Sequence, residues 1–250
     1  MWALKRRLTY TLFTLLIVIS SSFFLFRSSF VKASTCSDGI RNGGEVGVDC
    51  GGSCSLICSS DILPIETVWA NFFLNEDGGY DVGVLFLNKN SGSSPKSLAV
   101  TMILKSAKDE TLYEQKIVTP VPLATEFPVV IQNIKLQQKP KKIIVVKEED
   151  YSYVLPKKII TPVKTEASFD KASGKIIFVT LINTSKKDLF RFPVKVVLYD
   201  EKRIPIGVAE TFVDKLLKGE TKNVEVVLGR KYDTEPGTVR AYTSLDPYVF

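Results

Sequence analysis

A run of nineteen residues without a charged side chain, Leu8 to Phe26, limits what the start of this chain can be. An α-helix rises about 1.5 Å per residue, so this run would be about 28 Å long, close to the roughly 30 Å apolar thickness of a bilayer. Lys5, Arg6 and Arg7 precede it, and positive charge beside such a segment tends to stay in the cytoplasm. The sequence therefore predicts an N-terminal signal-anchor over 1–33, with a transmembrane helix over 8–26.

This topology predicts a single-pass protein of the plasma membrane with a cytoplasmic N-terminus and an extracytoplasmic remainder. A secretion signal that is cleaved near Ala33 is the alternative, since Val31-Lys32-Ala33 offers a cleavage site with small residues before Ser34. The apolar run is longer than an ordinary signal core, which favours a retained anchor. Both interpretations export the rest of the chain.

All four cysteines lie within the glycine-rich segment 34–60, with the spacing C-x13-C-x3-C-x3-C. An even number of cysteines in an exported segment with few apolar residues is typical of a small disulfide-stapled module. Four cysteines allow three pairings, and the spacing does not choose among them. Zinc is the alternative, although zinc sites generally use C-x2-C pairs. We predict disulfide bonds for Cys36, Cys50, Cys54 and Cys58.

The same segment carries a candidate calcium site. Asp38, Asn42, Glu45 and Asp49 recur every three or four residues among glycines, and hard oxygen ligands on a permissive loop are what calcium needs. The alternative is that these side chains form turns by bonding to their own backbone. Calcium is therefore the candidate cofactor that we predict for this segment.

The cysteine segment resembles a short motif of exported bacterial proteins, C-x-D-G-x-x-N-x-x-E-x-G-x-D-C-G-G-x-C. The matching positions are Cys36, Asp38-Gly39, Asn42, Glu45, Gly47, Asp49-Cys50-Gly51-Gly52 and Cys54. The resemblance covers about a tenth of the chain. It implies a cell-surface or secreted protein, usually with repeated β-domains, and it implies no activity.

From residue 61 onward, short apolar runs are separated by turn signals, which predicts strands. Tyr80, Val82, Val84 and Phe86 share one face of such a run, the period-two pattern of a strand. Strands of this length at these intervals are typical of a β-sandwich. The predicted strands of this first domain, 61–155, are 67–74, 80–86, 98–104, 112–118, 129–136 and 143–147.

The pattern then repeats after 94 or 95 residues. Leu87-Asn88 aligns with Ile182-Asn183, and Val100–Leu104 aligns with Val194–Leu198. This offset is about one immunoglobulin-sized domain, and it predicts a second sandwich over 163–250. The linker, 156–162, has proline at both ends and should allow limited flexing. The predicted strands are 176–183, 190–199, 204–212, 222–228 and 239–244. The predicted fold is thus mainly β, with an N-terminal transmembrane helix, a disulfide-rich module and two tandem immunoglobulin-like β-sandwiches.

The second copy resembles the FxLYD-type domain, a small immunoglobulin-like sandwich of bacterial envelope proteins. The resemblance rests on Asn183-Thr184-Ser185, Val196–Asp200 and the turn Leu217–Glu220, with valine in place of the name-giving phenylalanine. The first copy keeps only the apolar alternation, as in Met102–Ser106. Domains of this type are implied to be structural or binding modules, with no catalytic residues to carry over.

The composition restricts the chemistry. The chain has no histidine, which excludes Ser-His-Asp and Cys-His catalysis and histidine-ligated metal sites. The formal charge of +6 is scattered, so we predict no nucleic-acid partner. Any enzyme would have to use carboxylates, of which Glu148-Glu149-Asp150 is the densest run, or a Ser/Lys pair.

The predicted function is therefore not enzymatic. We expect a membrane-anchored extracytoplasmic protein that presents tandem β-sandwiches for binding or envelope structure, with an envelope protein or surface glycan as its partner. One alternative is a component of an envelope assembly or secretion machine that acts through its transmembrane helix, where Thr9, Thr11, Thr14 and Ser20–Ser22 would suit helix contacts in lipid. A less favoured alternative is an extracellular hydrolase that uses carboxylates.

Overall fold

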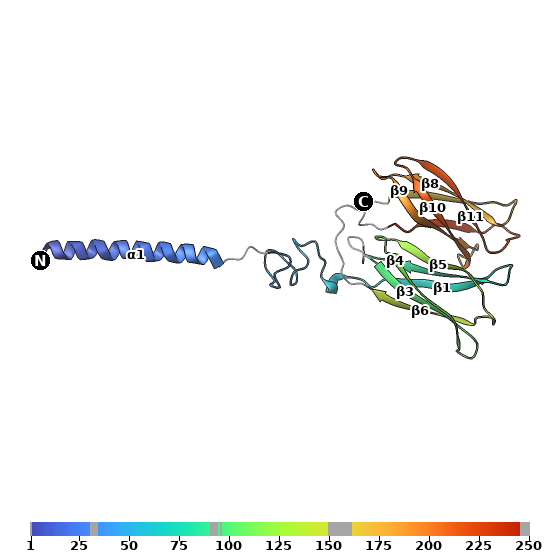
Figure 1. The fold of residues 1–250 in the computed structure, drawn as a ribbon, viewed down its shortest axis with the longest axis horizontal. Helices are drawn as coiled ribbons and strands as arrows, with labels where there is room; N and C mark the ends of the chain where they lie inside the picture. The colour runs from blue at the N-terminus through green and yellow to red at the C-terminus, as the bar shows by residue number, and fades with distance from the viewer. Residues whose placement is uncertain (1, 31–34, 91–94, 96, 150–161, 246–250) are drawn as a thin grey trace. The chain divides into compact units, whose positions relative to one another are not determined.

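The computed structural model describes residues 2–30, 35–90, 95, 97–149 and 162–245 (Figure 1). The chain divides into two compact units, Met1–Cys54 and Ser55–Phe250. The first unit holds helix α1 (Trp2–Phe30) and most of the cysteine segment. The second holds a short 3-10 helix, η1 (Ser59–Asp61), and all the strands β1 to β12. The fold is mainly β, as the sequence predicted.

Helix α1 includes the entire apolar run 8–26, which no proline or glycine interrupts. Among the residues that the structure describes, no helix is both long and apolar enough to cross a membrane. The proposed cleavage site at Ala33 and most of the linker, 156–161, lie outside the described residues.

The first sandwich consists of two antiparallel three-stranded sheets. One has the order β1-β2-β5 and the other the order β4-β3-β6. Tyr80, Val82, Val84 and Phe86 all point into the core between them, which confirms the face that the alternation predicted. The strands are β1 (Glu66–Leu74), β2 (Tyr80–Leu87), β3 (Ser97–Lys105), β4 (Thr111–Pro120), β5 (Glu126–Ile134) and β6 (Lys142–Glu149).

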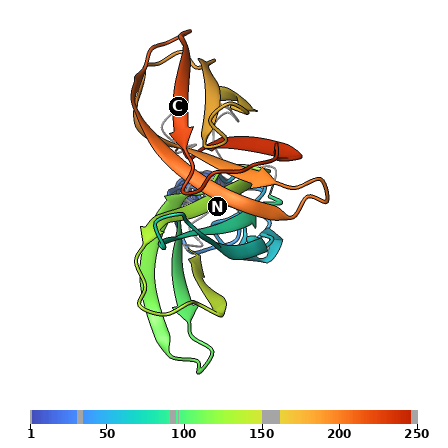
Figure 2. The ribbon, with the colours of Figure 1, turned by 90° about the vertical axis from the view of Figure 1, so that its right-hand side faces the viewer.

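The second sandwich repeats this plan, with sheets β11-β8-β7 and β10-β9-β12. Each strand of the first sandwich corresponds to the strand numbered six higher in the second, as β1 does to β7. The strand orders of the sheets then agree, so the two domains share one topology. Figure 2 shows the pair, with the first in cyan to yellow-green and the second in orange to red. The strands are β7 (Val163–Phe169), β8 (Ile176–Asn183), β9 (Leu189–Tyr199), β10 (Pro205–Leu216), β11 (Thr221–Val227) and β12 (Thr238–Thr243).

Two asparagines that the repeat aligned have the same structural role. Asn88 directly follows β2, and Asn183 is the last residue of β8. Both side chains are buried. The amide of Asn88 donates to Pro122 O (2.8 Å), and that of Asn183 donates to Leu216 O and Leu217 O (3.1 and 2.9 Å). Each asparagine thereby uses its side-chain amide to bind backbone carbonyl groups at or after the end of another strand.

The two sandwiches meet face to face within the second compact unit. Sheet β1-β2-β5 lies against sheet β10-β9-β12, so strand β2 is buried on both faces. A separate apolar cluster fills this junction, formed by Phe73, Val130, Val197, Tyr199 and Val208, with Trp69 and Tyr242 packed against it. The expectation of two domains that flex about a linker did not include this junction.

Gly83 marks a close approach between the two sheets. A Cβ atom at this position would lie 2.7 Å from Val208 Cγ1 and 3.2 Å from the Trp69 ring. Glycine lets β2 and β10 pack at a distance that a larger residue would not permit.

Replacing Gly83 by alanine should therefore destabilise the second unit by about 1–3 kcal/mol, because the added methyl group overpacks the junction. Urea denaturation of the full chain would measure this loss. The double variant Gly83→Ala/Val208→Ala removes the colliding methyl and should lose less than the sum of the two single variants. Strict additivity would show that the sheets do not meet at this point.

Candidate functional site

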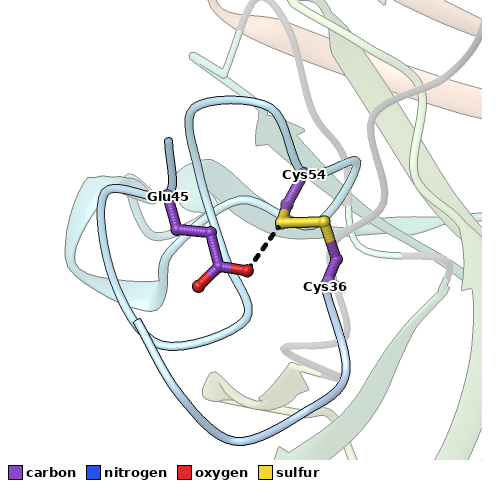
Figure 3. Close-up of side chains that lie close together, drawn as sticks. All are labelled: Cys36, Glu45 and Cys54. Carbon is purple, nitrogen blue, oxygen red and sulfur yellow. Dashed lines mark hydrogen bonds between the residues drawn. A yellow bond between two sulfur atoms is a disulfide. The ribbon is translucent and has the colours of Figure 1, made fainter. Parts of the chain in front are cut away.

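The cysteines form disulfide bonds, as predicted. Cys36 and Cys54 are bonded to each other, with a sequence separation of 18 and a Cα–Cα distance of 5.6 Å (Figure 3). Cys50 and Cys58 are also disulfide-bonded, so no cysteine is free. No thiolate is left for zinc, which removes the alternative interpretation of the spacing.

The four candidate calcium ligands lie in one hydrogen-bonded loop. Asp49 accepts from the backbone N–H groups of Asp38 (2.9 Å) and Gly39 (2.9 and 3.1 Å). Glu45 accepts from the N–H groups of Asn42 (3.3 Å) and Asp49 (3.1 Å). Asn42 Nδ2 donates to Asp38 Oδ2 at 3.2 Å. The structure therefore brings all four residues together.

Hydrogen bonds within the protein close this loop. Its carboxylates stabilise backbone N–H groups, which is the turn-forming role that the sequence left as an alternative. Glu45 Oε1 also lies 3.3 Å from Cys54 Sγ, the dashed contact in Figure 3. A disulfide sulfur carries no hydrogen, so this is a packing contact. The ligand atoms of Cys36, Cys54 and Glu45 lie within 4.8 Å of one another. They cannot form a thiolate metal site, because Cys36 and Cys54 are joined in a disulfide bond.

Calcium binding stays a prediction of the sequence. Carboxylate oxygens keep a second lone pair each, and Asn42 Oδ1 is buried with no hydrogen-bond partner. Calorimetric titration of Ca²⁺ into the oxidised full chain should then give one binding event at roughly 10⁻⁴ to 10⁻³ M that Asp38→Asn removes. Heat that persists in that variant would assign the binding to another place.

The junction between the sandwiches contains a buried ion pair that sequence analysis missed. Lys195 on β9 is 5% exposed and faces its cross-strand neighbour Glu210, with Nζ 3.7 Å from Oε2. Burial lowers the pKa of Lys195, and the nearby Glu210 partly opposes this effect. Burial likewise raises the pKa of Glu210, against the influence of Lys195. Both charges therefore lie in an environment that disfavours ionisation.

Lys195 also forms a hydrogen bond between the second sandwich and the first. Its ammonium group donates to Pro128 O in β5 and to Ser244 Oγ, both at 3.2 Å. The backbone N–H of Glu210 donates to Gln132 Oε1 at 3.0 Å in the same region. A lysine within an otherwise apolar strand gave no sequence signal for this role, because an outward-facing lysine ordinarily indicates a solvent-exposed face.

Two further ion pairs lie at the edge of the junction. Glu126 pairs with Arg240 (2.9 Å), and Glu76 pairs with Lys175 (2.7 Å) and accepts from the N–H of Lys231 (2.7 Å). In both pairs the first sandwich supplies the carboxylate and the second supplies the cation. The lysine partner lowers the pKa of Glu76. Complementary charge thus surrounds an apolar centre, the arrangement of a specific interface.

Asp81 is a buried carboxyl group on the junction face of β2. It is 3% exposed and accepts from Asn75 Nδ2 and Asn133 N, both at 2.8 Å. Desolvation raises its pKa above 3.8 even though these hydrogen bonds act in the opposite direction. The folded state therefore holds the Asp81 proton more tightly than the unfolded state does.

The sign of this linkage gives a pH prediction. Stability from Asp81 should be fully present below 3.8 and decline as pH rises from that value to the folded pKa. Asp81→Asn removes the titrating group. As pH rises through this window, the free energy of unfolding of the variant should therefore increase relative to that of the parent. Urea denaturation at several pH values from 3 upward would measure the difference. A difference that does not change with pH would contradict the raised pKa.

The residues considered for catalysis do not converge. Glu148 forms an exposed ion pair with Lys116 (2.6 Å), and Asp150 lies outside the described residues. Ser244 and Lys195 are in contact, which is the Ser/Lys combination that the composition allowed. Lys195, however, also donates to Pro128 O and faces Glu210, a carboxylate that favours its protonated form. This geometry favours a structural role for Lys195 over the role of a general base.

A groove of about 440 Å³ opens beside the ion pair, where β4, β5, β9 and β10 meet. Its lining combines Lys195 and Glu210 with two apolar side chains that are largely exposed, Val118 (64%) and Phe212 (68%). Val130 lines the groove and also belongs to the apolar cluster of the junction. The groove is therefore continuous with the contact between the sandwiches.

No protein-family model matches the chain, and no curated protein matches it.

Proposed function

We propose that this chain is an extracytoplasmic, non-enzymatic binding protein that presents its two sandwiches as one rigid body. The observation that carries the proposal is the junction, in which apolar packing, a buried ion pair and complementary edge charges join the two domains. Such a junction holds a composite surface in a fixed geometry, and a binding protein needs that preorganisation. An envelope protein or a surface glycan is the proposed class of partner.

An exported location is supported by the state of the cysteines. All four are disulfide-bonded, and structural disulfides form and persist in oxidising compartments outside the cytoplasm. The proposal assigns helix α1 the role of a signal-anchor at the plasma membrane, because its run 8–26 is uncharged and follows three basic residues. Secretion after cleavage near Ala33 is the alternative form of the same proposal.

The proposed role of α1 is to attach the protein to the membrane, and partner binding is assigned to the β-domains. The hydroxyls of Thr9, Thr11 and Thr14 donate to carbonyl groups one turn earlier in their own helix at 2.8–3.0 Å. These groups are satisfied without a neighbouring helix, which weighs against the alternative of a machine component that acts through helix packing.

Topology and binding can be tested separately on the same full chain. Intact cells treated with protease should lose the β-domains, and a maleimide reagent should find no free thiol in native material. Free thiols, or β-domains that are protected in intact cells, would overturn the proposed location. Immobilised protein should then retain a specific envelope protein or glycan from an envelope extract. Repeated failure to retain either would overturn the binding role.

A further inference from the structure

We propose that the groove at the sandwich junction binds an extended, apolar segment of another protein, which adds as a strand to the free edge of β4. This inference rests on the binding role proposed above and names the class of partner. Val118 of the first sandwich and Phe212 of the second both line this groove.

The backbone of β4 argues for a strand as the occupant. In the described part of the chain, β4 is the outer strand of its sheet and pairs only with β3. One row of its N–H and C=O groups therefore has no strand partner where Ile117 to Pro120 line the groove. An edge of this kind is a template for an added strand, which forms main-chain hydrogen bonds with it.

The side chains argue for an apolar partner. Phe212 and Val118 are among the most exposed large apolar residues of the two sandwiches, and Phe212 lies opposite Pro193 in the β9–β10 ladder. The charged residues in the lining, Lys195 and Glu210, already compensate each other. The groove thus combines exposed apolar side chains with a compensated ion pair, which suits a strand with alternate Val, Ile or Leu side chains.

The position of the groove argues that both sandwiches are needed. Val118 belongs to the first sandwich and Phe212 to the second, while Val130 continues from the groove into the buried junction. A bound strand would extend an interface that the protein already has. This continuity gives a physical reason for the rigid junction, because the site exists only while the two sandwiches are docked.

The test uses the oxidised full chain in a mild non-ionic detergent and a fluorescent peptide, Lys-Val-Thr-Val-Thr-Val-Lys, with fluorescence polarisation as the readout. Phe212→Ser should weaken binding about tenfold, as expected for an apolar anchor. The matched control is Phe190→Ser, because Phe190 lies on the adjacent strand, is 60% exposed and does not line the groove. This control should bind like the parent.

A second peptide of the same sequence, with alternate backbone nitrogens methylated, separates strand addition from simple apolar contact. Methylation removes the N–H donors along one edge of the peptide, so that edge can no longer donate to β4, and we expect weaker binding. Equal binding of both peptides, no binding of either, or equal losses in Phe212→Ser and Phe190→Ser would overturn the inference. Binding that appears only after deletion of residues 246–250 would assign the groove to the chain's own C-terminus and would also overturn it. The topology and thiol experiments do not depend on any of these results, so the inference can fail while the proposed location stands.

Discussion

Replacing Lys195 by methionine should destabilise the second unit by about 3 kcal/mol, because the change leaves Glu210 partly buried without its counter-ion. It also removes the hydrogen bonds that Lys195 donates to Pro128 O and Ser244 Oγ. Urea denaturation of the full chain measures this loss as a lower midpoint at an unchanged slope. The reverse truncation, Glu210→Leu, should be costly as well, since it isolates a buried ammonium group.

The double variant Lys195→Met/Glu210→Leu is the decisive control for this prediction. Removing both charges removes both desolvation costs, so the double variant should be about as stable as the parent or more stable. Lys116→Met provides the comparison with an exposed pair, because Lys116 and Glu148 are both more than half exposed and their pair should contribute less than about 1 kcal/mol. Equal effects of Lys195→Met and Lys116→Met would show that Lys195 is not buried in a junction in solution.

Replacing both Cys36 and Cys54 by serine should disorder the cysteine module. A bond that closes a loop of this length stabilises the folded state by about 3 kcal/mol, and the segment has few buried side chains that could compensate for its loss. In residues 35–54 the buried side chains are Glu45 and Cys54, which is too small a core to replace the bond. Hydrogen exchange should show faster exchange at the N–H groups of Gly39 and Asp49, which the carboxylates now protect.

The β-sandwiches supply the internal control for this variant. Their cores are separate from the module, so exchange in β2 and β9 and the urea midpoint should match those of the parent. Unchanged protection at Gly39 would contradict the expectation and would show that the hydrogen-bonded loop is stable without the bond. Asp49→Asn keeps a similar side-chain volume, and comparing it with the double cysteine variant would separate the carboxylate's contribution from the bond's contribution.

Alternation of apolar residues predicted most of the strands, because a half-buried strand places every second side chain in a core. It missed β7, where the inward residues include Thr165 and Ala167, which are too small or too polar to form a visible pattern. It also did not reveal the junction. A period of two identifies which face is apolar, and it does not say what a second buried face packs against.

A signal for the junction was nevertheless present in the sequence. Val196–Tyr199 is a continuous apolar run, and such runs are typical of strands that are buried on both faces. The position of Gly83 within an apolar strand is a second signal, since glycine in a strand often marks a close approach. Disulfide pairing had no such signal, because loop closure brings Cys36 to Cys54 through turns that spacing does not encode.

The junction joins unlike faces of two like domains. By strand order, sheet β1-β2-β5 corresponds to β7-β8-β11, and sheet β10-β9-β12 corresponds to β4-β3-β6. In the described part of the chain, each sandwich therefore leaves out of the contact the sheet that corresponds to the one its neighbour contributes. A two-fold symmetric contact between domains would be complete with two domains. This heterologous contact permits further domains, added by gene duplication, to stack on the last one in the same way.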